Sequence, residues 1–90
     1  MYLVLYDIES DKLRTKFSKY LEKFGRRLQY SVFEIKNSPR ILENIKTDIA
    51  NRFEKRFVQG DSVLIYSVPD TACAGRFGYP VNEETDLVFK

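Results

Sequence analysis

The first side chain that could take part in chemistry is Asp7, a carboxylate directly after a short apolar and aromatic run at residues 2–6. An unbroken apolar run of this length predicts a strand covered on both faces, and Ser10 and Asp11 offer a helix start soon after it. Asp7 would then stand at the carboxyl end of an interior strand, where α/β folds usually place their chemistry. Aspartate is also favoured in turns and caps, so a purely structural role for Asp7 stays open.

Basic residues are concentrated in the stretch that follows this acid. Residues 12–27 hold seven Lys or Arg side chains against Glu22 alone, whereas residues 1–11 hold three acids and no base. A solvated helix face is the ordinary origin of such a concentration, but so few accompanying acids favour contact with a polyanion. Four lysines recur at helical spacing, and two arginines follow them, of which Arg26 continues their line: Lys12, Lys16, Lys19, Lys23, Arg26 and Arg27. Doubled in a dimer, these cations could engage the phosphates of a duplex without reading its bases.

The composition excludes several classes of site. The chain of 90 residues contains no histidine and one cysteine, Cys73. Nucleophile pairs with His, His-ligated zinc and His general bases are excluded, which leaves carboxylates, Lys, Arg, Tyr or a hard metal ion for any catalysis. A lone cysteine forms no intramolecular disulfide, in agreement with a reducing compartment. No apolar run approaches the roughly 18 residues of a membrane span and no export leader is present, so we expect a cytoplasmic protein without membrane contact.

Two predicted elements would position the acid and the bases. A helix starts at Ser10 or Asp11 and runs to about Phe24, where Gly25 supplies the stop. The stretch 27–36 is rich in strand formers, but its alternation of apolar residues slips. Because a slip of one residue moves every side chain to the other face, a bend, a bulge or two short strands must intervene near residues 31–33.

The second half of the chain predicts one more helix and two more strands. Ser38 and Pro39 form a typical helix start. The helix that follows has a basic end, which suits the negative end of the helix dipole without any further function. A nearly continuous apolar strand is expected at 62–68 and a minimal one at 87–89.

The resulting order, β-α-β(β)-α-β with a strand-like tail, predicts an α+β fold of the ferredoxin-like class. In that sandwich two helices cover one face of a mainly antiparallel sheet. We expect a single domain over 1–90, with a core at 1–68 and a tail at 69–90. The open face of the sheet would carry too many large apolar residues to face water, so a second copy of the chain is its simplest cover. The strand at 87–89 could add to the sheet edge of that partner.

Four segments together resemble a known family, the CRISPR-associated Cas-two proteins, small adaptation factors often called endoribonucleases. In order they are Tyr6-Asp7-Ile8, Asp11-Lys12-Leu13-Arg14, Arg27-Leu28-Gln29-Tyr30-Ser31-Val32-Phe33-Glu34 and Asp61-Ser62-Val63-Leu64-Ile65-Tyr66. The resemblance extends to about Val68, and the part from Gln29 to Glu34 is its most specific piece.

This resemblance implies a homodimer whose C-terminal strands cross to the opposite subunit. It also implies a role in acquiring CRISPR spacers, in which the dimer bridges the Cas-one integrase and binds duplex DNA. Several members are described as magnesium-dependent nucleases on RNA or DNA. Asp7 matches their metal-binding acid, Arg14 and Arg27 match recurring basic residues, and Phe33 matches an aromatic residue. Lys16 stands where some members carry Arg, and it keeps the charge without the bidentate fork.

The residues leave two main functions open and a third less favoured. In a magnesium-dependent nuclease, a two-fold axis could bring both Asp7 residues of a dimer to one ion, since Mg²⁺ takes one or two carboxylates with water and phosphate. A single chain supplies one assured carboxylate, with Glu9 and Asp11 nearby in the sequence. A non-catalytic nucleic-acid-binding scaffold needs only the basic residues. A small metabolite-binding regulator fits the fold but not the concentrated basic charge. Tyr6 and Phe33 could stack on bases, although packing in the core is the favoured interpretation for both.

Overall fold

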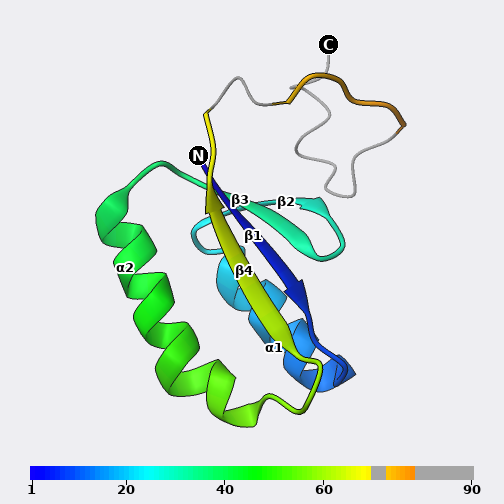
Figure 1. The fold of residues 1–90 in the computed structure, drawn as a ribbon, viewed down its shortest axis with the longest axis vertical. Helices are drawn as coiled ribbons and strands as arrows, with labels where there is room; N and C mark the ends of the chain where they lie inside the picture. Colours follow the sequence, from blue (N-terminus) through cyan, green and yellow to red (C-terminus); the bar gives the residue numbers. More distant parts are fainter. Residues whose placement is uncertain (70–72, 79–90) are drawn as a thin grey trace.

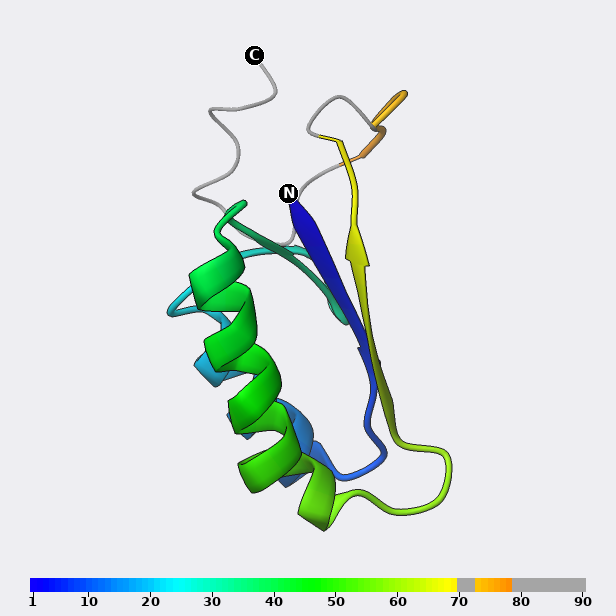
Figure 2. The same cartoon turned by 60° about the vertical axis from the view of Figure 1, so that its left-hand side comes forward.

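The computed structural model describes residues 1–69 and 73–78 of the chain. Its elements, in order, are β1 (Tyr2–Asp7), α1 (Asp11–Leu21), β2 (Gly25–Gln29), β3 (Val32–Ile35), α2 (Pro39–Asp48), the π-helical turn η1 (Ile49–Phe53), the 3-10 turn η2 (Glu54–Arg56) and β4 (Ser62–Ser67). The four strands form one antiparallel sheet in the order β2-β3-β1-β4, so β1 is an interior strand. Both helices lie on the same face of this sheet (Figures 1 and 2). The predicted ferredoxin-like α+β fold is confirmed; the predicted strand at 87–89 lies outside the described residues.

Serine caps start both helices, as the sequence predicts. The Ser10 hydroxyl accepts a hydrogen bond from the backbone N–H of Leu13 at 3.2 Å, and the Ser38 hydroxyl accepts one from Ile41 at 3.3 Å. Pro39 follows Ser38 at the first helical position, where its missing N–H costs nothing. Since each cap satisfies an otherwise unpaired backbone N–H, the start of each helix is determined by its own local sequence.

The end of α1 differs from the prediction. The helix ends at Leu21 and not near Phe24, and Gly25 is the first residue of β2, not a helix stop. A Cβ atom at Gly25 would lie 1.9 Å from the backbone oxygen of Glu34 on β3. Glycine is therefore required here by the close approach of two strands.

The slip in alternation between residues 27 and 36 marks a hairpin. β2 and β3 are two short strands joined by a tight turn at Tyr30 and Ser31, and their register shifts between Arg27 and Gln29. Of the alternatives that the sequence left open, the structure combines two short strands with an irregularity in the first of them. The turn at residues 30 and 31 overlaps the expected position near residues 31–33, and the register shift precedes it.

The core lies between the sheet and the helices. Tyr2, Val4 and Tyr6 of β1 point into it, as do alternate residues of β3. Its fully buried members come from every layer: Val4, Ile8, Phe17, Leu21, Phe33, Ile35 and Ile45.

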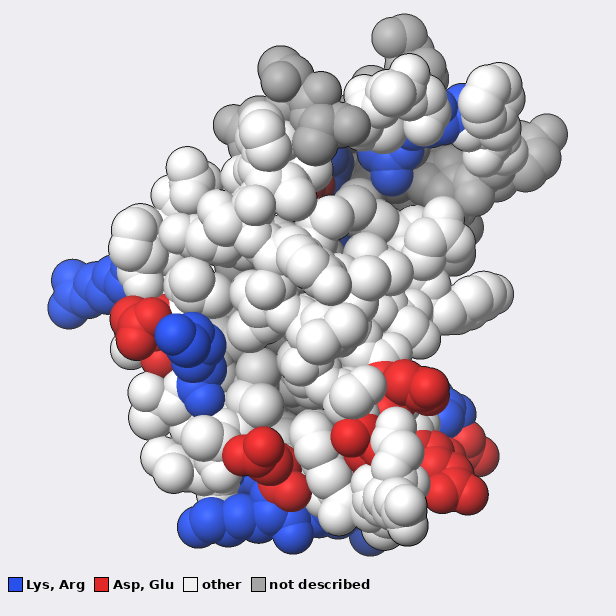
Figure 3. Space-filling model, viewed as in Figure 1, with Lys and Arg blue, Asp and Glu red and all other residues white. Residues whose placement is uncertain are grey.

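The opposite face of the sheet is apolar and uncovered in a single chain. Leu64 and Tyr66 of β4 are each 52% exposed. They lie directly opposite Leu5 and Leu3, which are half-buried on the same face. Figure 3, which shows this side of the molecule, has no charged side chain in the middle of the sheet. The expectation of a large apolar outer face is thus confirmed within the described residues.

Candidate metal and nucleic-acid site

Asp7 is the last residue of β1 and lies directly opposite Ser62 of β4. Because side chains alternate along a strand, Asp7 shares the uncovered face of the sheet with Leu3 and Leu5. Its side chain is exposed and forms no hydrogen bond or ion pair with any residue that the structure describes. Since Ser10 caps α1, no capping interaction occupies the Asp7 carboxylate.

Arg14 holds the turn that follows Asp7. Its Nη1 donates to the backbone oxygen of Ile8 at 2.9 Å and to that of Glu9 at 3.4 Å. Its Nη2 forms an ion pair with the carboxylate of Asp11. The guanidinium thus connects the end of β1 to the first turn of α1, so part of its hydrogen-bonding capacity is already used inside the chain.

Asp61 holds the same turn from the other side, and sequence reasoning gave it no role in the site. Its Oδ1 accepts a hydrogen bond from the N–H of Glu9 and its Oδ2 accepts one from Val58, both at 2.9 Å. The β1–α1 turn is thereby tied to the loop before β4. The signal in the sequence was an acid directly after a glycine, a pair typical of turns. In the structure, Gly60 has a φ of 97° and forms such a turn.

The acids near Asp7 do not form a complete metal site within one chain. Acidic side chains gather at the end of the sheet where β1 finishes (Figure 3, red, lower right). Nevertheless, no three Asp, Glu or Cys residues in the described part of the chain stand close enough together to hold a metal ion. Mg²⁺ takes one or two carboxylates together with waters and phosphate oxygens. The free Asp7 carboxylate fits one such ligand, and the remaining protein ligands would have to come from elsewhere.

Arg14 and Arg27 are brought together at one cavity of about 550 Å³, which Lys19 also lines. Arg27 is 3.9 Å from the carboxylate of Glu22, and its guanidinium lies 5.3 Å from the centre of the Phe33 ring. This cavity does not include Asp7. The acid and the two arginines that the sequence singled out therefore belong to neighbouring regions, not to a single pocket.

The two aromatic residues considered for base stacking are packed in the core. Phe33 is 0% exposed and Tyr6 is 5% exposed. The Tyr6 hydroxyl donates to the backbone oxygen of Tyr30 at 3.0 Å. Burial raises the pKa of Tyr6, and the positive charges of Arg27 and Arg14 oppose that shift. Core packing, the favoured interpretation, is confirmed for both rings.

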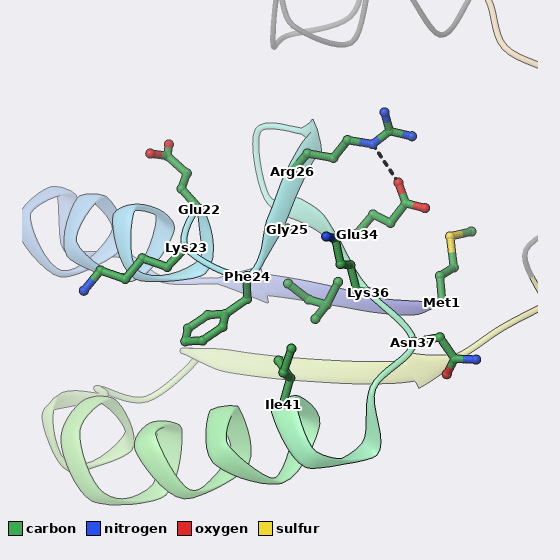
Figure 4. A pocket seen from close by; sticks show the side chains of 11 residues that line it. Met1, Glu22, Lys23, Phe24, Gly25, Arg26, Glu34, Lys36, Asn37 and Ile41 are labelled. Atoms are coloured by element: carbon green, nitrogen blue, oxygen red, sulfur yellow. Dashed lines mark hydrogen bonds and ion pairs between the residues drawn. The ribbon is translucent and has the colours of Figure 1, made fainter.

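Arg26 lies away from Arg27, on the opposite face of β2. It pairs with Glu34 across the hairpin, Nε to Oε1 at 2.8 Å, at the rim of a cavity of about 750 Å³. Figure 4 shows that pair beside the cavity, with Phe24 and Ile41 pointing into the space below it. The prediction that Arg26 continues the lysine line of the helix is wrong, because α1 ends before it and β2 turns it to another face.

Lys16 is exposed, as are the other lysines of the predicted row, Lys12, Lys19 and Lys23. It lies on α1, and no described residue forms an ion pair with it.

No helix of the described residues is long and apolar enough to cross a membrane.

The comparisons with known proteins agree on one family. Residues 1–74 match the family model of CRISPR associated protein Cas2. The chain is similar to an endoribonuclease Cas2 of Thermus thermophilus, with 33% identity over 94 aligned positions that cover 98% of this chain and 97% of the relative. It is also similar to an endoribonuclease Cas2 of Archaeoglobus fulgidus, with 36% identity over 70 residues, 77% of this chain and 69% of the relative.

Two solved structures share the fold. A hypothetical protein from Thermus thermophilus superposes with a TM-score of 0.66 at 33% identity, covering 88% of this chain and 94% of that one. The Cas2 of Streptococcus pyogenes superposes with a TM-score of 0.65 at 25% identity, covering 78% and 87%.

Proposed function

Because the chain belongs to the CRISPR associated protein Cas2 family, we propose that it is a homodimeric nucleic-acid-binding protein of CRISPR adaptation with a magnesium-dependent endonuclease centre at Asp7. In this proposal the dimer binds duplex DNA and bridges the Cas-one integrase in the cytoplasm during spacer acquisition. Its substrates for cleavage are phosphodiesters of RNA or DNA. The endoribonuclease names of the relatives support a nuclease activity.

The observation that carries the proposal is the position of Asp7 at the end of an uncovered apolar face. A second copy packed on Leu3, Leu5, Leu64 and Tyr66 would remove these side chains from water. Under two-fold symmetry the same face is used by both chains, so an acid at its edge is present twice. The tail beyond residue 69 would then belong to the dimer, with the strand at 87–89 adding to the partner's sheet.

The two Asp7 carboxylates of the dimer would hold the magnesium ion that is the cofactor of this proposal. When bound, the ion supplies polarisation of a phosphate and activation of a water molecule. The chain's own contribution is to hold the two acids: Arg14 and Asp61 fix the turn behind each Asp7. We assign nucleic-acid contacts to Lys16 and, where their internal pairs open, to Arg14, Arg26 and Arg27.

A non-catalytic scaffold is the second candidate function, and one observation favours it. Each of the three arginines is already paired with a carboxylate of its own chain, and one chain's described residues contain no three-acid metal group. A protein that only holds nucleic acid next to the integrase would need neither the metal nor free arginines near Asp7.

Exchange of Asp7 separates the two candidates. Asp7→Asn keeps the size of the side chain and removes its charge, so it should abolish magnesium-dependent cleavage of RNA and DNA oligonucleotides while the dimer persists. Glu9→Gln, the same change two residues away on the same turn, should leave cleavage unchanged. Cleavage is followed on end-labelled substrates and the dimer by light scattering.

The outcomes are distinct. Cleavage that survives in Asp7→Asn removes the acid from the catalytic centre. No cleavage by the unmodified protein, together with spacer integration that survives in Asp7→Asn, would replace the nuclease with the scaffold.

A further inference from the structure

A groove on the helix layer collects basic side chains from two distant parts of the chain. It has a volume of about 440 Å³ and lies between α1 and the turns that follow α2. The cations along it are Lys16, Lys19, Lys23, Arg52 and Arg56, and its other lining residues are Tyr20 and Phe53. We call these residues the helix groove. No acid is among them.

The bases of the helix groove differ from Arg14, Arg26 and Arg27 in their pairing. Arg14, Arg26 and Arg27 each have a carboxylate partner. In the helix groove, by contrast, none of the five cations has a carboxylate partner among the described residues. Other unpaired bases, such as Lys12 and Lys55, are exposed but do not line this groove.

The helix dipole explains only part of this arrangement. Basic residues near a helix C-terminus are stabilising, which accounts for Arg52 and Arg56 taken alone. It does not explain why they face three lysines of another helix, since like charges repel and a chain without a ligand gains nothing from the convergence. An anion between the two helices would turn that repulsion into attraction.

The floor of the helix groove shows what kind of anion contact it offers. Tyr20 and Phe53 are 6% and 4% exposed, so their rings are covered and cannot stack on bases. Arg52 covers them, with its guanidinium 5.4 Å from the Tyr20 ring centre and 5.2 Å from that of Phe53. The Tyr20 hydroxyl is engaged by Asp48. What remains accessible is positive charge alone, which recognises phosphates without reading sequence.

The helix groove and Asp7 lie on opposite sides of the sheet. Both helices cover one face (Figure 2), whereas Asp7 shares the other face with Leu3 and Leu5. A second copy on the uncovered face would leave both helix grooves on the outside of the dimer. Lys19 also lines the cavity of Arg14 and Arg27, so the positive charge continues from the helix groove toward β2.

We propose that the helix groove is a sequence-independent binding site for the sugar-phosphate backbone of a nucleic acid, separate from the Asp7 centre. It rests on the proposed function, because it specifies where the nucleic acid is held. Arg52 and Arg56, which the sequence explained by the dipole alone, become binding residues. The site supplies affinity from the outer side of the dimer and does not depend on the metal.

The test compares two triple variants with the same change of charge. The groove variant is Lys16→Gln, Lys19→Gln and Arg56→Gln, and all three side chains are exposed. The control variant is Lys36→Gln, Arg40→Gln and Lys55→Gln, exposed bases that have no carboxylate partner among the described residues and do not line the groove. Binding of two unrelated duplexes of equal length is measured by fluorescence anisotropy between 50 and 200 mM salt, without magnesium.

The groove variant should bind both duplexes on the order of 10- to 100-fold more weakly at 50 mM salt, with a log–log salt slope smaller by about 3 per chain. The control variant should bind both duplexes about as tightly as the unmodified protein. Equal losses in the groove and control variants, or no loss in the groove variant, would overturn the helix groove while leaving nucleic-acid binding intact. Absence of binding by the unmodified protein would instead remove the proposed function and the helix groove with it.

Discussion

At the scale of single residues, the candidate site depends on side chains that hold Asp7 in place. Arg14 donates to two backbone oxygens of the β1–α1 turn, and Asp61 accepts from one N–H of the same turn. Both act on the backbone that carries the acid, so they are positioning residues. Arg14 is therefore expected to matter for the geometry of Asp7 before it matters for contact with phosphate.

Tyr20 gives a prediction of pH dependence at this scale. Burial and then the hydrogen bond to Asp48 raise the pKa of Tyr20 above its ordinary value of 10.0. Below pH 10 the tyrosine is protonated in both states and its stabilisation is fully present. As the pH rises past 10 the unfolded chain ionises first, so this stabilisation is lost progressively toward the raised folded-state pKa.

Tyr20→Phe should lower the free energy of unfolding by about 1 kcal/mol at pH 7, the usual net worth of one hydrogen bond. The difference between the two proteins should shrink as the pH rises above 10, because the variant has no such group to titrate. Urea unfolding at pH 7 and at several pH values above 9 measures both effects. A difference that is independent of pH would show that the Tyr20 hydroxyl does not contribute through its protonated form.

At the scale of the elements, the close approach of β2 and β3 gives the next prediction. Gly25→Ala places a Cβ atom 1.9 Å from the Glu34 backbone oxygen and 2.9 Å from Ile35 Cδ1. Since backbone has to shift, we expect a loss of about 3 kcal/mol in the free energy of unfolding. Gly75→Ala is the control, because its nearest atom is 3.7 Å away, and it should change stability by less than about 0.5 kcal/mol. Equal stability of the two variants in urea would contradict the strand geometry.

Most elements were predictable from local pattern. The apolar runs of β1 and β4 and the serine caps of both helices carry their own signals, and each appears where expected. The end of α1 was not predictable, because Gly25 looks like a helix stop. Glycine is needed there for another reason: a Cβ atom would collide with the Glu34 backbone oxygen of β3, which lies elsewhere in the sequence. The sequence showed the hairpin only as a slip in the alternation of apolar residues, because the turn at residues 30 and 31 lacks the glycine that usually marks a hairpin.

Some features of the candidate site were likewise predictable from the sequence, and others were not. Asp7 was predictable because it ends an apolar run, which is a local feature of the sequence. The partners of Arg26 and Arg27 were not, because Glu34 and Glu22 come near them only in the folded chain. The helix groove needed the packing of α1 beside η1 and η2, which no spacing in the sequence reveals.

At the scale of the whole molecule, the uncovered sheet face predicts the assembly. Leu64→Glu places a charge in the middle of the proposed interface, at a position 52% exposed in one chain, so the chain should still fold. Val58→Glu is the control, because Val58 is 54% exposed and lies outside the sheet. The first variant should sediment as a monomer of 10.6 kDa and the second as a dimer. A dimer in both, or a monomer in the unmodified protein, would rule out this face as the interface.

The most direct test of the Asp7 pair is a crystal structure of the protein grown with magnesium, in which the positions of the two Asp7 carboxylates are measured. The proposal predicts both carboxylates around one ion on the two-fold axis, with oxygen ligands at about 2.1 Å. Carboxylates on opposite sides of the particle, out of reach of a common ion, would contradict it.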